Sequence, residues 1–536
     1  MWPCNWASVS GLRLAFYSNN RIRRQEKMDA ERYVFRRQFI FGPRRVSLFP
    51  KWKNEELGAG HYLAVHPDLP YTIVKCGQNY LVLLGYILDP DYPERTDEQI
   101  VRGVLESSAT LDGVFRALNR MFGRYAVIAS LNGNLVSFSD PIGARALFYC
   151  NDSSGRLWCA SQSSILAELF GLRTDLTIEK ELFGLPLFRG TEYWYPGILT
   201  AYREISHLIP NHYLDHYTKM QVRYWPVKEL VKTGSGDSLE RVVQLWRGAF
   251  KALCARFDSA LGITAGFDSR MLLAASRDVS PGLHYITHTH ENLGISGPDI
   301  VLPSQMLPRL GLKHTILFHS EHIDPDFERI YRRNVTTARR GKGMNAYAFF
   351  CHFEETGKER LVINGNGGEI TRNFFFLPRI IPFSGFSLST LVGMDSSPLA
   401  VDQFGTWLSE VKGIETLGYS ILDLLYWEQR IGNWASMSFS EYDIAFESFS
   451  PFGSRELLES MLSVSASQRC WPDYRYHQDL IKRLWPETLE YEWNPVKGRG
   501  AGLRKSLRHT YIHEAVKAIR YLRFSGKRHL QSIKKN

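Results

Sequence analysis

The stretch from residue 260 to residue 275 decides the fold, and it reads ALGITAGFDSRMLLAA. Its first four residues form an apolar run of strand length, small residues follow as far as Gly266, and Met271 opens a second apolar run of helical character. Small side chains let backbone amides approach a phosphate, and the start of the following helix offers unpaired N–H groups and the positive end of its dipole. By itself, the stretch is equally compatible with a turn in which Ser269 or Asp268 caps a buried helix.

A phosphate-binding loop of this kind would use backbone amides and small polar side chains. The hydroxyls of Thr264 and Ser269 can add donors, whereas a carboxylate beside a phosphate makes sense only when it holds Mg²⁺. We therefore predict Asp268 as a metal ligand. The residues expected to contact the phosphates are Thr264, Ala265, Gly266, Phe267, Asp268 and Ser269.

The 536-residue chain is long for one core, so we expect two domains and terminal segments. Residues 1–45 are predicted to be a basic extension, and residues 46–231 a strand-rich domain, because short alternating aromatic runs are broken there by turn residues. Residues 232–238 read KTGSGDS and are the predicted linker. Residues 239–502 alternate helical patterns with short apolar strands, which favours an α/β domain with a parallel sheet. Runs expected to be strands in the first domain include Tyr71–Val74, Tyr80–Leu84, Tyr125–Ser130, Leu135–Ser139 and Leu147–Cys150.

The net charge of +10 is concentrated at one end of the chain. Residues 503–536 hold ten Lys or Arg and one acidic residue, so +9 of the charge lies there and +1 in the rest. A nucleic-acid-binding body would spread its basic surface over folded elements, and none is expected here. Apolar residues recur near helical spacing in this segment, which we interpret as a basic C-terminal helical tail, solvated or docked. A contact with anionic lipid, RNA or a partner is the alternative.

The cysteines and the apolar runs favour a cytoplasmic protein. The seven cysteines are scattered and never spaced as CxxC, a pattern typical of reduced thiols. No apolar run approaches the ~20 residues that a transmembrane helix requires, so no transmembrane segment is expected.

Five segments in order resemble the asparagine synthetase family. The first is the loop quoted above, which resembles that family's PP-loop, SGGxDS. Val362–Glu369 is similar to its SGxGxD element, with Glu369 in the place of the acid that is the second magnesium ligand. The others are Leu283–Thr287 with Asp299 and Leu310–His314, then Glu447–Phe452 in the place of ExRxPF, and Asn494–Gly500 in the place of the loop whose lysine closes on the phosphates.

The resemblance implies a fold and an activity. The expected fold is an Ntn-hydrolase-like α+β domain with antiparallel sheets, followed by an α/β ATP pyrophosphatase domain of the PP-loop type with a parallel sheet, similar to adenine nucleotide alpha hydrolases. The expected reaction is adenylation of a carboxylate, such as aspartate, by Mg²⁺-ATP, with release of pyrophosphate and transfer of the acyl group to ammonia or an amine. The residues that the resemblance assigns are Asp268 and Glu369 to the metal, Ile286, Gly365 and Gly367 to the nucleotide, and Lys497 and Asn366 to catalysis. Arg499 is an alternative to Lys497 as the cation. A homodimer is compatible with the family.

The first half resembles the glutaminase half of the same enzymes at Met121–Ile128 and Asp140–Tyr149, segments that concern strands and packing. Glutaminase activity in that family needs a cysteine as the mature first residue, where its own amine serves as base. Residue 2 here is Trp, and Cys4 follows Pro3. The RGPD and NGEIYN segments that hold glutamine are absent, so we expect a degenerate glutaminase domain without activity. The layout is similar to that of beta-lactam synthetase.

Several positions depart from the family pattern. Asn366 stands where the family has a glutamate able to take a proton from the amine, and an amide is no base near neutral pH. Ala265 replaces a loop glycine, which requires a φ below zero. Arg270 is expected either to point toward the phosphates or to lie in solvent, and Phe449 and Ser454 to reshape the acid-substrate pocket. His284, His288 and His290 are interpreted as ordinary strand-end histidines rather than a metal site. The alternatives are a nucleotide-binding pseudoenzyme and an amidating enzyme of a sugar-acid or peptide pathway.

Overall fold

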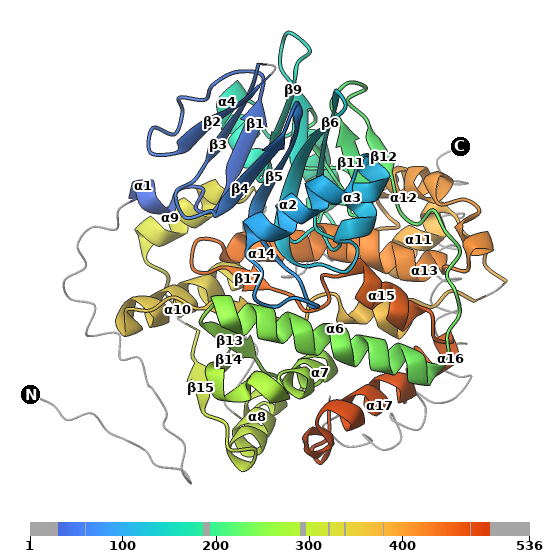
Figure 1. Ribbon diagram of the computed structural model, residues 1–536. Helices are drawn as coiled ribbons and strands as arrows, with labels where there is room; N and C mark the ends of the chain where they lie inside the picture. Colours follow the sequence, from blue (N-terminus) through green and yellow to red (C-terminus); the bar gives the residue numbers. More distant parts are fainter. Residues whose placement is uncertain are drawn as a thin grey trace, which may run out of the picture.

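The computed structural model describes residues 30–58, 60–185, 193–289, 296–319, 322–336, 339–378, 380–471 and 473–493. The N-terminal half, blue to green in Figure 1, contains two antiparallel sheets, and the C-terminal half contains a parallel sheet among helices. The expected order of an antiparallel α+β part followed by an α/β part is thereby confirmed.

Two six-stranded sheets stack face to face in the N-terminal half. The first has the order β10 (Ser206–His207), β8 (Phe148–Asn151), β9 (Leu157–Ala160), β1 (Phe39–Gly42), β3 (His61–Val65) and β2 (Lys53–Gly58). The second has the order β12 (Gln221–Arg223), β11 (His212–Asp215), β7 (Asn134–Ser139), β6 (Phe122–Leu131), β5 (Asn79–Leu88) and β4 (Tyr71–Cys76). Alternate residues of both sheets, among them Phe39, Leu63, Val82 and Ile128, form the buried layer between them. The expected strands are all present.

Helices cover the outer faces of this pair of sheets. The apolar stripes of α2 (Asp97–Ser107) and α3 (Leu111–Leu118) pack on the second sheet, and α4 (Ser163–Phe170) packs on the first. Thr96 and Gln99 start α2 with a reciprocal capping box. The remaining helices of this half are α1 (Ala30–Tyr33) and α5 (Leu176–Phe183).

The predicted boundary of the N-terminal extension, residues 1–45, is wrong at its end. Strand β1 lies inside that range and pairs with both β3 and β9 in the interior of the first sheet. Arg36 and Arg37 before it are buried because their guanidinium groups pair with Glu359 of the C-terminal half. The strand has only four residues and basic residues on both sides, so the composition of the segment indicated a basic extension.

The C-terminal half is built on a five-stranded parallel sheet with the order β15 (His314–Leu317), β14 (Leu283–His288), β13 (Ser259–Gly262), β16 (Leu361–Ile363) and β17 (Ser448–Phe449). The chain passes from β13 to β14 and β15 on one side, and then crosses to β16 on the other side of β13. This reversal makes the carboxyl ends of β13 and β16 the switch point of the sheet, where open α/β sheets bind ligands.

Helix α6 (Ser235–Arg256) buries Val242, Trp246, Phe250 and Leu253 along one stripe. It begins inside the predicted linker, so the irregular connection ends at Gly234. The other α-helices of this half are α7 (Phe267–Ala275), α8 (Pro298–Arg309), α9 (Pro325–Asn334), α10 (Arg340–Thr356), α11 (Gly385–Leu391), α12 (Pro398–Glu410), α13 (Ile421–Leu424), α14 (Ser436–Tyr442), α15 (Arg455–Leu462), α16 (Ala466–Arg469) and α17 (Arg475–Leu484). Short 3-10 turns are η1 (Arg277–Gly282), η2 (Gly368–Arg372), η3 (Ile414–Leu417) and η5 (Pro486–Leu489), and η4 (Leu425–Ala435) is π-helical.

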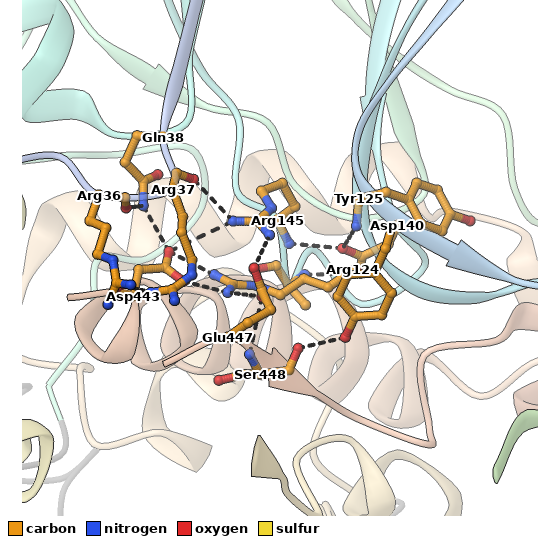
Figure 2. Close-up of polar contacts among 12 residues, drawn as sticks. Arg36, Arg37, Gln38, Arg124, Tyr125, Asp140, Arg145, Asp443, Glu447 and Ser448 are labelled. Atoms are coloured by element: carbon orange, nitrogen blue, oxygen red, sulfur yellow. Dashed lines mark hydrogen bonds and ion pairs between the residues drawn. The ribbon is translucent and has the colours of Figure 1, made fainter. Parts of the chain in front are cut away.

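The two halves meet at a buried cluster of charges, shown in Figure 2. Arg124 donates to Asp443 Oδ2 at 2.9 Å and to Glu447 Oε1 at 2.6 Å, and Arg145 donates to Glu447 Oε2 at 2.8 Å. Both arginine side chains are about 1% exposed. Such pairs are costly to break, since removing one partner leaves an uncompensated buried charge. The cluster therefore holds Glu447, and β17 directly after it, against the first half.

The motifs of the first half account for this packing. Asp140 accepts hydrogen bonds from the backbone amides of Ala144 and Arg145 at 2.9 and 2.8 Å, and this turn positions Arg145 toward Glu447.

No helix among the described ranges is both long and apolar enough to span a membrane.

Candidate active site

The predicted loop follows β13, and α7 begins at Phe267. Leu261 pairs with Ile363 in the neighbouring parallel strand β16, so the segments after both strands emerge at the same edge of the sheet. A Cβ atom on Gly365 would lie 3.0 Å from Asp268 Cβ, and one on Gly368 would lie 2.4 Å from Asp268 Oδ1. The two segments, about 100 residues apart in the sequence, therefore meet at the switch point, and residue 368 has no room for a side chain.

The hydroxyls of the loop hold its shape. Ser269 Oγ accepts from the Thr264 amide at 3.2 Å and lies 3.0 Å from the Gly266 carbonyl, and the Gly266 amide donates to Thr264 Oγ1 at 3.0 Å. The Ala265 amide donates to Asp299 Oδ1 at 2.9 Å. Ala265 is not among the described residues with a positive φ, as its replacement of glycine requires.

Helix α7 has no side-chain cap. Its N-cap is Gly266, and neither Ser269 nor Asp268 takes the capping role that the alternative interpretation gave them. A helix start without a capping side chain leaves first-turn amides available to an anion. The geometry thus favours the phosphate-binding interpretation over the capped turn.

Asp268 and Glu369, the two predicted metal ligands, share an arginine. Arg372 Nη2 donates to Asp268 Oδ2 at 2.6 Å and lies 3.6 Å from Glu369 Oε1. Burial raises the pKa of Asp268 to about 7, an effect that Arg372 opposes and Glu369 reinforces. Burial alone would lower the pKa of Arg372, but the carboxylates of Asp268 and Glu369 raise it. Sequence reasoning missed Arg372, although its position three residues after Glu369 placed it on the same turn.

The donor set fits Mg²⁺ that is shared with a phosphate ligand. Asp268 Oδ1 is buried and has no hydrogen-bond partner among the described residues. In the same part of the chain, no group of three or more His, Cys, Asp or Glu could hold a metal ion. Mg²⁺ is commonly held by one or two carboxylates plus substrate phosphates, so two acids suffice when phosphate oxygens complete the coordination.

The segment after β16 packs against the side chains of Ser450 and Phe452. Ser450 Oγ donates to the Asn366 carbonyl at 2.5 Å, and the Asn366 amide donates to Asn364 Oδ1 at 3.2 Å. Gly367 has φ +102°, and a Cβ there would meet Phe452 Cβ at 3.1 Å. Asn366 thus lies in the site at its predicted place, and it brings no group that could act as a base.

Arg270 contradicts both expectations for it. Its side chain is completely buried and donates from Nη1 to the carbonyl oxygens of Thr488 and Tyr491 at 2.6 and 2.8 Å. It points neither to solvent nor to the predicted phosphate position, because α7 turns this residue toward the C-terminal segment. Burial lowers the pKa of Arg270 to about 10.

Ile286 lies beside the loop through its backbone, since its carbonyl accepts from the Ile263 amide at 2.8 Å. Its side chain is 2% exposed and belongs to the core. Phe449 is also buried, and Ser454 caps α15. One side chain fills the core and the other closes a helix, and a changed substrate pocket stays a prediction.

Lys497, Arg499 and the whole predicted segment Asn494–Gly500 lie outside the described residues, as does the basic tail. The described chain reaches Trp493, whose ring is 5.3 Å from that of Phe267 at the start of α7. The last described residues before the predicted lysine segment therefore lie beside the loop.

Two of the three histidines lie in β14. His284 is half exposed and lies 3.6 Å from Asp258, and His288 packs against Phe349. His290 lies outside the described residues. The interpretation of the three as strand-end histidines stays a prediction.

The glutaminase prediction rests on the first residues of the chain, and residues 1–29 lie outside the described part. Directly before β1, Gln38 Nε2 donates to Asp443 Oδ2 at 2.7 Å. Cys4 lies outside the described residues. Burial raises the pKa of Cys150 to about 12 and that of Cys254 to about 11, so these thiols stay protonated.

Comparisons with known proteins give weak similarities. No protein-family model matches the sequence, and no curated protein matches it. Among solved structures, the allosteric regulatory enzyme of purine biosynthesis has a TM-score of 0.23 at 11% identity, over 57% of this chain and 74% of that chain. Glutamine phosphoribosylpyrophosphate amidotransferase from B. subtilis, complexed with ADP and GMP, has 0.23 at 11%, over 62% and 76%. Glutamine-dependent NAD+ synthetase from Acinetobacter baumannii, in complex with ADP, has 0.20 at 11%, over 59% and 70%. At these values the similarities assign no family.

Proposed function

We propose that this chain is an ATP-dependent ligase that activates a carboxylate as its acyl-adenylate and transfers the acyl group to ammonia or an amine. One observation carries the proposal: the uncapped start of α7, with Asp268, meets the Glu369 segment at the switch point of the parallel sheet. The order of the segments that resemble asparagine synthetases supports the same reaction.

Each part of the site has a role in this reaction. The amides at the start of α7 bind the leaving pyrophosphate, and the hydroxyls of Thr264 and Ser269 keep the loop in shape. Asp268 and Glu369 would hold Mg²⁺, which neutralises charge on the phosphates. Lys497 is proposed to supply a further positive charge from the segment after Trp493.

The chemistry proceeds in two displacements. A carboxylate oxygen of the acid attacks the α-phosphorus of ATP, and the bond from that phosphorus to the bridging oxygen breaks, which releases pyrophosphate. A nitrogen lone pair then attacks the acyl carbon, AMP leaves with the bonding pair, and the nitrogen loses a proton. Asn366 cannot accept that proton. The proposed nucleophile is therefore ammonia or an amine that arrives as the free base, and after the attack its nitrogen loses a proton to the substrate or to solvent.

Nucleotide binding without turnover is the second candidate. It is favoured by Arg372, which already pairs with Asp268 and Glu369, and by Asn366 in place of a base. This candidate predicts binding of Mg²⁺-ATP with no release of pyrophosphate.

ATP–pyrophosphate exchange with a panel of carboxylic acids, aspartate and sugar acids included, tests the ligase proposal. We expect exchange that depends on one acid class and is lost in Asp268→Asn, because that variant removes a metal ligand without changing side-chain size. Asp326→Asn is the matched control, since that exposed carboxylate pairs with nearby Arg329 on α9. Binding of Mg²⁺-ATP without exchange for any acid would establish the second candidate, and absence of nucleotide binding would refute both.

A further inference from the structure

Arg372 holds an unusual place in the candidate site. It ends η2, the short turn that also carries Glu369, and its guanidinium lies against Asp268 from the loop after β13. The side chain is 8% exposed, so this cation is not a solvated surface charge. The ring of Tyr474 lies 5.5 Å from the guanidinium carbon and closes one side of it.

The hydrogen bonding of this group is incomplete on both sides of the pair. Arg372 Nε is buried and has no hydrogen-bond partner among the described residues, and the same is true of Asp268 Oδ1. Arginine has five N–H donors, and a buried donor left unpaired costs about 1–3 kcal/mol. The ion pair therefore has one unsatisfied donor, Arg372 Nε, and one unsatisfied acceptor, Asp268 Oδ1. An anion would satisfy the donor, and a cation would satisfy the acceptor.

The charges explain why both ligands would arrive together. When both carboxylates are ionised, they and the guanidinium leave the cluster with a single negative charge, which repels a bare phosphate. A divalent cation on the carboxylates turns this into a single positive charge, which attracts one. The guanidinium then loses its carboxylate partner and, being buried, needs another anion.

We propose that Arg372 is the resident cation of this site: it neutralises Asp268 and Glu369 in the free protein, releases them to Mg²⁺, and then binds the phosphate oxygens. The inference rests on the proposed function and specifies how the same site is regulated. It makes Arg372 both a competitor of the metal and a ligand of the pyrophosphate, and its planar, bidentate donors suit phosphate oxygens. The alternative is a permanent ion pair that keeps metal and phosphate away.

Three full-length proteins test the two halves of the proposal: the wild type, Arg372→Met and Asp268→Asn. Arg203→Met is the control, because it removes an arginine that pairs with Asp175 on the surface, far from the loop in the sequence. The first measurement is the melting temperature with MgCl₂ alone. We expect little change in the wild type and in Arg203→Met, and a clear rise in Arg372→Met, whose two carboxylates have lost their internal cation. Equal rises in the wild type and Arg372→Met would overturn the proposal.

The second measurement is calorimetric binding of inorganic pyrophosphate with and without Mg²⁺. We expect Arg372→Met to bind Mg²⁺-pyrophosphate at least tenfold more weakly than the wild type, and unchanged affinity would overturn the proposal. We also expect Asp268→Asn to bind metal-free pyrophosphate more tightly than the wild type, because Arg372 is then released from its carboxylate. If Arg372→Met does not fold, this affinity of Asp268→Asn for pyrophosphate decides whether Arg372 binds the anion. A wild type that binds no pyrophosphate would refute the proposed function, whereas the Mg²⁺ melting series would still show whether Arg372 excludes the metal.

Discussion

Arg270 donates from Nη1 to the carbonyl oxygen of Thr488 at 2.6 Å and thereby ties the first turn of α7 to the segment that ends the described chain. The same nitrogen donates to the Tyr491 carbonyl, and Trp493 lies against Phe267 two residues further on. The loop and the approach to the predicted lysine segment are thus parts of one packed unit. Substitutions outside the immediate site should therefore change nucleotide binding.

Arg270→Met is expected to loosen that unit. Two carbonyls lose their donor, of which that of Thr488 is buried, so the free energy of unfolding should fall by about 1–3 kcal/mol. The affinity for Mg²⁺-ATP should fall about tenfold, which corresponds to ~1.4 kcal/mol. Urea unfolding and calorimetry measure the two effects. Arg277→Met is the comparison, because the contact of Arg277 with the Leu484 carbonyl is longer, at 3.4 Å. Equal effects of the two substitutions would show that Arg270 does not hold the start of α7 to the C-terminal segment.

Glu447→Gln is expected to destabilise the junction of the two halves. Arg124 and Arg145 would keep their buried charges with one carboxylate fewer, and breaking such pairs costs about 3–5 kcal/mol. Chemical unfolding at pH 7 measures the loss. Glu98→Gln provides the control, since that exposed pair with Arg102 on α2 should change little. A loss no larger than in the control would show that the cluster does not stabilise the junction.

The same carboxylate predicts a pH dependence. Burial alone would raise the pKa of Glu447, but the guanidinium groups of Arg145 and Arg124 lower it from 4.5 to about 2. Between these values the unfolded chain binds the proton and the folded protein does not, so stability falls as the pH falls from about 4.5 to about 2. Unfolding midpoints at several pH values should therefore drop more steeply in the wild type than in Glu447→Gln. Parallel curves would rule out this carboxylate as a source of the acid sensitivity.

Gly368→Ala is expected to close the space beside Asp268. Its Cβ would lie 2.4 Å from Asp268 Oδ1, a distance at which the carboxylate must move. Pyrophosphate affinity should fall at least about tenfold, an equivalent of ~1.4 kcal/mol. Gly103→Ala is the control, because a Cβ there meets nothing within 4 Å and alanine favours helix α2 by about 1 kcal/mol. Wild-type affinity in Gly368→Ala would place the phosphate site elsewhere.

Ser269→Ala tests the shape of the loop. Its hydroxyl contacts the Thr264 amide and the Gly266 carbonyl, and each such bond contributes about 1 kcal/mol net. We expect Mg²⁺-ATP affinity to fall five- to tenfold, an equivalent of about 1–1.4 kcal/mol, and the melting temperature to fall as well, because the same bonds stabilise the folded loop. Ser467→Ala, at an exposed position of α16, should have no effect on either quantity. A melting temperature that falls while affinity stays constant would make Ser269 a purely structural residue.

Local pattern determined the core of this protein. The strand, small-residue loop and helix from Ala260 to Ala275, and the glycine-rich segment ending at Glu369, were predictable because an apolar run and the small residues after it report their own backbone geometry. The alternating strands of the first half, such as β5 and β6, followed from the same kind of signal.

Only the tertiary structure decided which charges meet. Arg372 lies 104 positions from Asp268, Arg270 contacts a carbonyl 218 positions away, and Arg124 pairs with Glu447 across 323 positions. Nothing in a run of letters distinguishes these arginines from solvated ones, because a buried ion pair depends on a partner that folding brings near. For the same reason, β1 was wrongly placed in the N-terminal extension: Glu359, which pairs with both Arg36 and Arg37, comes from the other half of the chain.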